Sequence, residues 1–393
     1  MSKWLRLVCA DRSLREAFFV FALSRCLILA IFVVAAAATL DTTSARYDPE
    51  DPHPAASLRI ATVKAQLEHT LGRGDSGWYT QIARHGYDRA PFEAQQPHNW
   101  VFFPLYPFLL RAAGAVTGNY LIAGALISNA FFFIALVLLH KLVAALGYDS
   151  PTADRALFYT AMFPVSYFFS LPFTEALFLC LNVAAFFAAA RDRWCAAGVF
   201  GGFASATRLA GVVLVPALAL FRSGNAGAIR EWRRLLCLAL IPCGLLAFIL
   251  FLWRTTGDPL AFVHAQTTWR RSGGFFLLTL YDYIRHPLNV IEPWNFRLLN
   301  FAAAVLALAT AFFWARRRCW PFAIFTFLAI VLPLSSMTLQ ATTRYVAVIF
   351  PVFIALAIWG RNPRIDQLVR VAFLVLLGVM TLSYALRFSF ASA

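Results

Sequence analysis

Long apolar runs alternate with short polar segments along the whole of this 393-residue chain. A helix needs about 20 mostly apolar residues to cross the hydrocarbon core of a bilayer, and runs of about that length recur from end to end. Trp and Tyr tend to lie near the ends of the runs, where amphipathic rings favour the membrane interface. The pattern predicts membrane-spanning helices within residues 17–40, 101–146, 155–170, 173–190, 194–221, 235–254, 298–315, 321–334, 345–360 and 368–386.

Two of these ranges permit more than one interpretation. Residues 101–146 could form two spans, or one span preceded by an interfacial helix. Residues 194–221 could form one span, or two half-helices interrupted near Thr207-Arg208-Leu209. We favour the interruption, because an arginine at membrane depth requires a polar cavity and broken helices are tolerated there. The fold class is therefore an all-α polytopic membrane protein with about eleven spans.

Two polar stretches, residues 41–100 and 255–297, are expected to be long loops that carry juxtamembrane helices within a single domain of residues 1–393. In the first loop, a helix that begins at Asp75 would place Trp78, Tyr79 and Ile82 on one face. Such a helix is expected to lie on the membrane surface with its aromatic face down. Asp75 could serve there simply as the N-cap.

Basic residues gather in short clusters beside the spans, and such clusters mark cytoplasmic segments. They place residues 1–16 in the cytoplasm and both long loops outside, and an interruption at Arg208 places Glu175 and Arg208 on the outer side as well. The clusters are Lys3, Arg6, Arg12 and Arg15; Arg222, Arg230, Arg233 and Arg234; Arg316, Arg317 and Arg318; and Arg361 with Arg364.

The composition agrees with a membrane protein, since 61% of the residues are hydrophobic and only 13% are charged. The net charge of +15 does not indicate nucleic-acid binding, because the cations form separate clusters and no extended stripe. Nearly all of them are arginine, which suggests a bacterial source. Neither long loop contains any of the seven cysteines and no CxxC pair occurs, so neither a disulfide framework nor a zinc site is implied. The first run is too long for a cleavable signal peptide and is expected to remain as a helix.

Several motifs occur in an order that resembles a known family. The first is D-x-x-W-Y-x-x-I-A-x-x-G-Y, from Asp75 to Tyr87, followed by FFPLYP at residues 102–107. Further similar segments are SLPFTEALFLCLNVAAFFAA (170–189), WCAAGVFGGFASATRLAGVVL (194–214), GDPLAFVHAQTTWRR (257–271) and TTRYVAVIFPVF (342–353). Together they resemble the PIG-V family of mannosyltransferases, which add the second mannose to GPI anchors, and their bacterial relatives in the GT-C superfamily. One departure is Gly74, where the family usually has a bulky residue before the aspartate.

This resemblance implies transfer of mannose from a polyprenyl- or dolichyl-phosphate donor to a hydroxyl acceptor at the outer membrane face. Inverting transfer needs a carboxylate that takes the acceptor's proton, and Asp75 is the candidate general base. The leaving group is a lipid phosphate, which arginine can hold with two hydrogen bonds. Arg344, Arg208 and Arg270 are the candidates, although Arg270 and Arg271 could be solvated loop charges and Arg344 could snorkel to the interface.

Six further residues are candidates for contacts to the sugar or the acceptor: Glu175, Trp78, Tyr79, His264, Gln266 and Trp269. Each has a plainer interpretation. Glu175 could be a first-turn carboxylate favoured by the helix dipole, and Trp78 and Tyr79 could be interface anchors. A lone histidine such as His264 is more often structural.

No D-x-D motif and no glycine-rich phosphate loop occurs, which agrees with a lipid-linked donor. No cofactor is required, and a divalent metal is compatible with the chemistry but not implied. The expected partners are membrane lipids, the donor and a hydroxyl acceptor, which in the inner membrane of a bacterium would be a glycolipid, a cell-wall polymer or a protein. The alternatives are transfer of another lipid-linked sugar such as arabinose or glucose, a transporter or flippase, and a non-catalytic scaffold. A transporter would usually show internal repeats and polar residues at the middle of several spans, and neither is evident.

Overall fold

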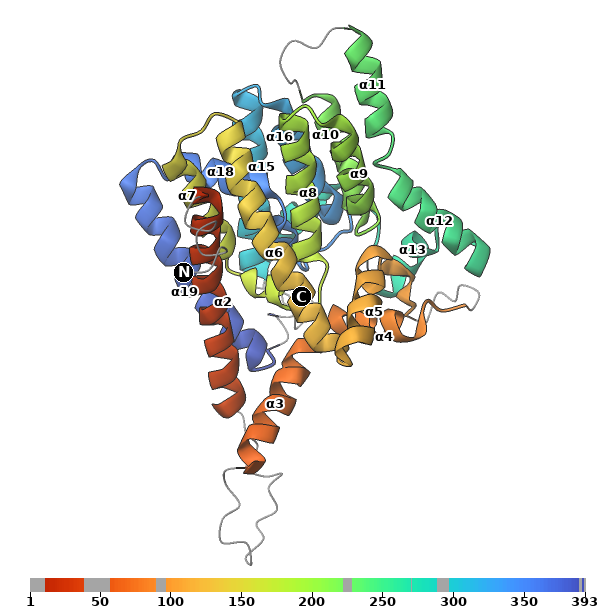
Figure 1. The fold of residues 1–393 in the computed structure, drawn as a ribbon, viewed down its shortest axis with the longest axis vertical. Helices are drawn as coiled ribbons and strands as arrows, with labels where there is room; N and C mark the ends of the chain where they lie inside the picture. Colours follow the sequence, from red (N-terminus) through yellow and green to blue (C-terminus); the bar gives the residue numbers. More distant parts are fainter. Residues whose placement is uncertain are drawn as a thin grey trace, which may run out of the picture.

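The computed structural model describes residues 11–38, 57–89, 97–221, 228–269, 271–287, 297–388 and 391. These residues form helices joined by turns, with no strand among them, so the prediction of an all-α fold is confirmed (Figure 1). The α-helices are α2 (Arg12–Ala38), α3 (Ser57–Leu71), α4 (Asp75–His85), α5 (Leu105–Thr117), α6 (Tyr120–Ala145), α7 (Ser150–Ala161), α8 (Glu175–Ala190), α9 (Trp194–Ser205), α10 (Leu214–Ala219), α11 (Ala228–Leu238), α12 (Cys243–Thr256), α13 (Ala261–His264), α14 (Phe276–Arg285), α15 (Arg297–Arg316), α16 (Trp320–Leu334), α17 (Thr342–Ala347), α18 (Phe350–Trp359) and α19 (Pro363–Ala385). The 3-10 helices are η1 (Asn99–Val101), η2 (Ser166–Ser170), η3 (Leu209–Val213) and η4 (Ala265–Trp269).

Several helices are long and apolar enough to cross a membrane. Within the described ranges there are five such stretches, namely α2, α6, Glu231–Thr256, α15 and α19. Large apolar side chains on them face outward, as Phe19 of α2 and Leu368 of α19 do. Five shorter apolar helices of 10–17 residues pack among them. The chain is a multi-pass membrane protein.

Residues 101–146 divide into the short helix α5 and the long helix α6. Gly118 ends α5 in the left-handed conformation, with φ 72°, which favours glycine. Asn119 then caps α6, because its side-chain oxygen accepts hydrogen bonds from the backbone N–H groups of Leu121 and Ile122. Of the two interpretations, a single long helix preceded by a short one is correct.

The predicted interruption of residues 194–221 is confirmed. Helix α9 ends at Ser205, Arg208 is extended, and η3 begins at Leu209. Gly211 packs directly on the end of α9, where a Cβ atom would lie 2.6 Å from the carbonyl oxygen of Ala204. The chain can therefore turn back closely only because this residue has no side chain.

Three other predicted spans, residues 155–170, 235–254 and 345–360, are also interrupted, so their prediction as single continuous helices is wrong. Helix α11 ends at Leu238 and α12 begins at Cys243. Helix α7 ends at Ala161 and is followed by Pro164 and η2, while α17 ends at Ala347 and α18 begins at Phe350. Proline at position 164 disfavours helical backbone at the residue before it and supplies no N–H donor. Pro351 lies in the first turn of α18, where that missing donor costs nothing.

The interruption before α8 is held by an arginine from the first helix. Arg25 of α2 donates hydrogen bonds to the carbonyl oxygen of Ser166 (3.0 Å) and to the hydroxyl oxygens of Ser166 (2.5 Å) and Ser170 (2.9 Å). Its guanidinium also lies 4.6 Å from the ring centre of Phe132. Carbonyl and hydroxyl groups thus satisfy this cation within an apolar helix, as a charge at membrane depth requires.

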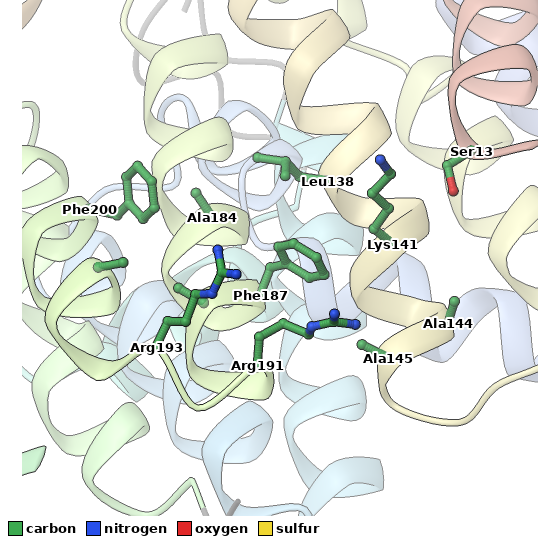
Figure 2. A pocket seen from close by; sticks show the side chains of 12 residues that line it. Ser13, Leu138, Lys141, Ala144, Ala145, Ala184, Phe187, Arg191, Arg193 and Phe200 are labelled. Carbon is green, nitrogen blue, oxygen red and sulfur yellow. The ribbon is translucent and has the colours of Figure 1, made fainter. Parts of the chain in front are cut away.

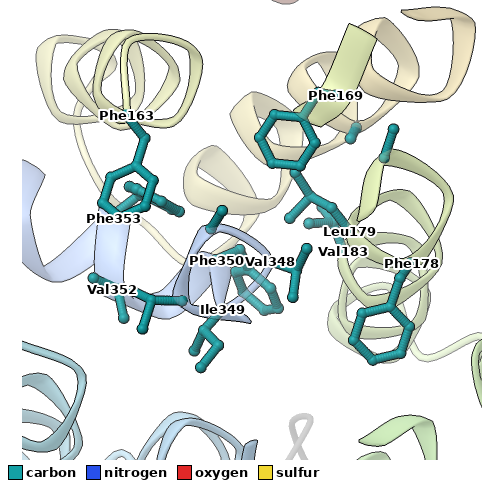
Figure 3. Close-up of a cluster of buried hydrophobic side chains, with 14 of the residues drawn as sticks. Phe163, Phe169, Phe178, Leu179, Val183, Val348, Ile349, Phe350, Val352 and Phe353 are labelled. Atoms are coloured by element: carbon teal, nitrogen blue, oxygen red, sulfur yellow. The ribbon is translucent and has the colours of Figure 1, made fainter. Parts of the chain in front are cut away.

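Helix α8 lies at the centre of the bundle, between α6 and α9 (Figure 1). Almost all of its side chains are buried, from Glu175 at its first residue to Ala189 near its end. Phe178, Leu179 and Val183 face a cluster of buried side chains that includes Phe350 and Phe353 of α18 (Figure 3). The helix therefore carries Glu175 into a region that water scarcely reaches.

One disulfide joins α9 to α11, between Cys195 and Cys237. The cysteine spacing implied no disulfide framework, and this bond between described residues corrects that expectation. The two residues lie on separate helices and are 42 positions apart, so their spacing carries no signal. The backbones meet because Gly198, one turn beyond Cys195, leaves room for the carbonyl group of Cys237.

Candidate active site

Helix α4 presents Asp75 at its first turn. The N-cap is Gly74, with φ 60° and ψ −137°, a conformation that residues with a side chain rarely adopt. This accounts for glycine at the position where the resembling family has a bulky residue. Asp75 is the first helical residue and makes an ion pair with Arg344, so its interpretation as a simple N-cap is wrong.

The aromatic face of α4 packs against protein and not against lipid. The Tyr79 ring is 6% exposed and lies 5.1 Å from Phe102, 5.2 Å from Tyr106 and 6.5 Å from Phe173, measured between ring centres. Trp78 stacks on Phe102 at 5.7 Å. The expectation of an aromatic face lying on the membrane is therefore wrong, because these rings pack on other aromatic side chains of the protein and α5 lies beside α4 (Figure 1).

The Tyr79 hydroxyl lies close to the start of α8. It donates a hydrogen bond of 3.4 Å to the hydroxyl oxygen of Thr174, the residue before Glu175. Burial raises the pKa of the Tyr79 phenol above its usual range, and the nearby carboxylates of Asp75 and Glu175 raise it further. Tyr79 is therefore a neutral donor that links α4 to α8.

Four charged residues from four separate segments meet in what we term the ion-pair cluster: Asp75, Glu175, Arg208 and Arg344. Arg344 Nη2 lies 2.8 Å from Asp75 Oδ2, and Arg344 Nε lies 3.1 Å from Glu175 Oε1. Arg208 Nη1 donates a 2.9 Å hydrogen bond to the same Glu175 oxygen. The structure thus brings together the predicted base, the predicted second carboxylate and two of the three predicted phosphate-binding arginines.

Arg344 is held rigidly at the centre of the cluster. Its neighbour Thr343 donates hydrogen bonds from its backbone N–H (2.9 Å) and its hydroxyl (2.7 Å) to the side-chain oxygen of Asn300. The guanidinium of Arg344 lies 5.3 Å from the ring centre of Phe168 and 5.4 Å from that of Phe173. Aromatic walls exclude water, so the charges interact more strongly than at a surface. Arg344 is buried and does not merely snorkel to the interface.

Tyr345 and Arg271 adjoin the cluster, although neither was predicted from the sequence to be a site residue. The guanidinium of Arg208 lies 5.0 Å from the ring centre of Tyr345, and Arg271 Nη2 donates a 2.8 Å hydrogen bond to the Tyr345 hydroxyl. Arg271 is partly buried, which contradicts its alternative as a solvated loop charge. Tyr345 directly follows the predicted Arg344 in the sequence, and this position could have identified it as a site residue. Arg270 lies outside the described residues.

The members of the cluster differ in exposure. The Asp75 side chain is 25% exposed and that of Arg208 17%, whereas the Glu175 side chain is 1% exposed. Glu175 Oε2 is buried and has no hydrogen-bond partner within the described part of the chain, although a buried polar atom left unpaired costs about 1–3 kcal/mol. A molecule arriving from solvent would therefore meet Asp75 and Arg208 before Glu175.

The predicted residues of the second loop have other surroundings. His264 is half-exposed, and its Nδ1 lies 2.6 Å from Asp258 Oδ2 within the same loop. The backbone oxygen of Gln266 accepts a hydrogen bond of 3.2 Å from the Arg271 N–H, which ties η4 to the residue that reaches Tyr345. Trp269 ends η4, and its side chain lies outside the described atoms. A sugar contact by these three residues stays a prediction.

A metal site is not evident among the side chains that the structure describes. No three of the His, Cys, Asp and Glu residues in the described ranges come together as ligands. The two carboxylates of the ion-pair cluster are instead engaged by arginines. Arginine side chains can hold an anion and a carboxylate can accept a proton, so the cluster contains the chemical groups for both.

The fold and this site define a multi-pass helical membrane protein with a charged cluster at one end of its helices. The family described as mannosyltransferase (PIG-V) matches residues 15–252, more than half of the chain. The chain belongs to the PIG-V mannosyltransferase family.

Two curated relatives agree with this assignment. GPI alpha-1,6-mannosyltransferase 2 of Cricetulus griseus is 30% identical over 179 residues, which cover 42% of this chain and 34% of that protein. The protein of the same name from Rattus norvegicus is 28% identical over 174 residues, with the same coverage of 42% and 34%. The chain thus spans about a third of the length of the curated relatives it matches.

Solved structures show a weaker likeness. The apo oligosaccharyltransferase of Archaeoglobus fulgidus has a TM-score of 0.43 at 13% identity, over 93% of this chain and 56% of that one. The oligosaccharyltransferase AglB of the same organism, in complex with an inhibitory peptide and a dolichol-phosphate, has a TM-score of 0.41 at 13% identity with the same coverage.

Proposed function

We propose that this protein is a GT-C-type glycosyltransferase that moves mannose from a polyprenyl-phosphate donor to a hydroxyl acceptor. The family and the names of the curated relatives support the sugar and the reaction class. The observation that carries the proposal is the ion-pair cluster, in which an accessible carboxylate lies beside a group of arginines at the surface end of apolar helices.

Asp75 is the general base in this proposal. Its carboxylate takes the proton of the acceptor hydroxyl while the acceptor oxygen bonds to the anomeric carbon. The bond from that carbon to the phosphate oxygen breaks at the same time, and the lipid phosphate leaves with the electron pair. A single displacement from the opposite face inverts the anomeric configuration.

Arginines receive the leaving phosphate. Arg208 is partly exposed and Arg271 partly buried, and both lie against Tyr345, so they form one side of an anion site next to Asp75. Hydrogen bonds from a guanidinium to phosphate oxygens are charge-assisted and strengthen as the leaving group gains charge. These steps require no cofactor, and a divalent metal is compatible with them but not implied.

Glu175 acts through its neighbours. It is 1% exposed, and one of its oxygens engages Arg208 and Arg344 together. We assign it to positioning these two arginines, with direct contact to the donor sugar as the alternative if the buried Oε2 atom becomes accessible when substrate binds. Arg344 in turn fixes the orientation of Asp75.

The positive charges at the helix ends support a site on the outer face of the membrane. Arg191 and Arg193 follow the last residue of α8, while Glu175 is its first. Because clustered basic residues mark the cytoplasmic side, the ion-pair cluster faces the outside, and in a bacterium the protein lies in the inner membrane. The donor is then a polyprenyl-phosphate sugar on the outer leaflet.

The test is sugar transfer in membranes that contain the protein, supplied with labelled polyprenyl-phosphate-mannose. Wild type should label an acceptor, and Asp75→Asn should transfer about 100- to 10,000-fold more slowly, because general base catalysis contributes about that factor. The matched control is Asp149→Asn, an exposed carboxylate paired with Arg361, which should retain activity within about twofold.

The outcomes separate the parts of the proposal. Equal activity of wild type and Asp75→Asn would show that the base is another group. Polyprenyl-phosphate-glucose and -arabinose are assayed in parallel, and label from one of these in place of mannose would overturn the sugar assignment while retaining the mechanism.

A further inference from the structure

A cavity of about 800 Å³ lies at the opposite end of α8 from the ion-pair cluster (Figure 2). Helix α8 has 16 residues and is therefore about 24 Å long, which separates this cavity from Glu175. The walls come from the start of α2, the last turns of α6 and α8, and the start of α9. The lining residues are Ser13, Leu138, Lys141, Ala144, Ala145, Ala184, Phe187, Ala188, Arg191, Arg193, Ala196 and Phe200.

The lining divides into an apolar part and a cationic part. Leu138, Phe187, Phe200 and the alanines are apolar, whereas Lys141, Arg191 and Arg193 carry positive charge (Figure 2). No acidic residue is among the described residues that line the cavity. A ligand that matches both parts has an anionic group joined to an apolar body.

The two arginines of the turn between α8 and α9 are available for such an anion. Among the described residues, neither the Arg191 nor the Arg193 side chain has a hydrogen-bond or ion-pair partner, whereas Lys141 pairs with Asp11 at 2.9 Å. Asp192, which lies between the arginines in sequence, instead accepts a hydrogen bond of 2.7 Å from the Trp194 indole. Two free guanidiniums beside the apolar wall thus lack a counter-charge.

The start of α9 also favours binding of an anion in this cavity. Arg193 is the N-cap of this 12-residue helix and makes no side-chain capping bond. The first N–H groups of a helix without such a cap favour an anion, since the helix dipole places partial positive charge there. The cations, the helix start and the apolar wall all meet at one end of the helical bundle.

We propose that this cavity binds an anionic glycerophospholipid. Its phosphate diester lies against Arg191 and Arg193, and the upper part of its acyl chains lies along Leu138, Phe187 and Phe200. The turn between α8 and α9 directly follows a buried apolar helix, so it lies at the depth of the lipid head groups. The bound lipid would join α6, α8 and α9 through one phosphate.

Lipid retention by the purified full-length protein tests this site. The protein in mild detergent is incubated with phosphatidylglycerol or phosphatidylcholine, and bound lipid is counted by native mass spectrometry. We expect wild type to retain phosphatidylglycerol, and the double variant Arg191→Gln/Arg193→Gln to bind it about tenfold more weakly, with little change for phosphatidylcholine.

The matched control removes two positive charges from a turn outside the cavity lining. Arg317→Gln/Arg318→Gln lies in the turn between α15 and α16, away from the cavity lining, and should retain phosphatidylglycerol as wild type does. Equal loss in both double variants, or in neither, would overturn the proposal. Gel filtration and thermal unfolding confirm that both variants fold.

A soluble competitor distinguishes a site for a phospholipid from a site for a small soluble phosphate. Glycerol 3-phosphate carries the anion without acyl chains and should not displace the lipid at millimolar concentration. Displacement at that concentration would show a small-anion site and overturn the assignment to a lipid. The readout is binding, so it is independent of sugar transfer.

Discussion

A single oxygen atom of Glu175 engages two arginines in a setting from which water is nearly excluded. Buried ion pairs of this kind are costly to form, and removing one partner leaves an uncompensated charge. Glu175 therefore stabilises the fold only together with Arg208 and Arg344. Its contribution must be measured as the coupling free energy between Glu175 and an arginine in a double-mutant cycle.

We expect Glu175→Gln to lower the free energy of unfolding by about 3 kcal/mol, because it leaves both arginines without this carboxylate. The double variant Glu175→Gln/Arg208→Gln should lower the free energy of unfolding by less than the sum of the two single changes. The difference, which is the coupling free energy, should be about 1 kcal/mol or more. Unfolding by SDS in mixed micelles provides the measurement.

The exposed pair of Asp149 and Arg361 serves as the control cycle, since both side chains are 52% exposed at a separation of 3.4 Å. The same double cycle there should give a coupling of about 0.5 kcal/mol or less. If the Glu175 cycle gave no more than this value, the buried pair would contribute nothing specific to the site.

At the level of the element, the position of Asp75 depends on how α4 begins. Arg73 donates a hydrogen bond to the carbonyl oxygen of Tyr384 in α19, and the Tyr384 hydroxyl donates one of 3.2 Å to the carbonyl oxygen of Thr70. The turn between α3 and α4 is thereby joined to α19. Gly74 completes this turn with a positive φ, and the turn places the Asp75 carboxylate beside Arg344.

We expect Gly74→Ala to lower the free energy of unfolding by about 1–3 kcal/mol, because alanine is strained at this φ and ψ. Transfer activity should fall as well, since the carboxylate of Asp75 shifts with the turn. Gly77→Ala is the control within the same helix: it is exposed, has room for a Cβ atom, and should stabilise α4 by about 0.5–1 kcal/mol. Equal melting temperatures for the two variants would contradict the strain at Gly74.

The elements also show which parts of the fold the sequence could reveal. The break at Arg208 was predictable, because a cation within an apolar run signals a polar surrounding. The break before α8 was not predicted. Hydropathy measures the free energy of transfer into lipid, and it contains no information about which distant groups accept the hydrogen bonds of Arg25. In the same way, Asp75 and Arg344 were each recognisable, but their 2.8 Å pairing depends on how distant helices pack.

For the molecule as a whole, α8 separates two charged regions of different kind. The ion-pair cluster at one end contains two carboxylates, whereas the described lining of the cavity at the other end has three cations and no acid. Two described members of the basic clusters lie on the side of the cavity: Arg12 directly precedes Ser13 of its lining, and Arg361 pairs with Asp149, which follows the end of α6. The proposed reaction and the proposed lipid site accordingly lie in different leaflets.

This orientation predicts how engineered cysteines react in intact cells. Gly77→Cys in α4 should be labelled by a membrane-impermeant maleimide, whereas Arg318→Cys in the turn after α15 should react only after the membrane is permeabilised. Both positions are exposed, and the parent chain supplies the background from its own cysteines. The reverse pattern would place the ion-pair cluster in the cytoplasm.

The hydrogen bonds of Arg25 have a consequence for biogenesis. Its acceptor Ser166 lies 141 residues further along the chain, so roughly ten seconds of synthesis separate the two at usual elongation rates. An arginine near the middle of an inserting helix costs about 2.5–3.5 kcal/mol, which the other apolar residues of α2 must offset until the partners arrive. The first helix therefore reaches its final stability in the bilayer only when the translocating chain has delivered η2.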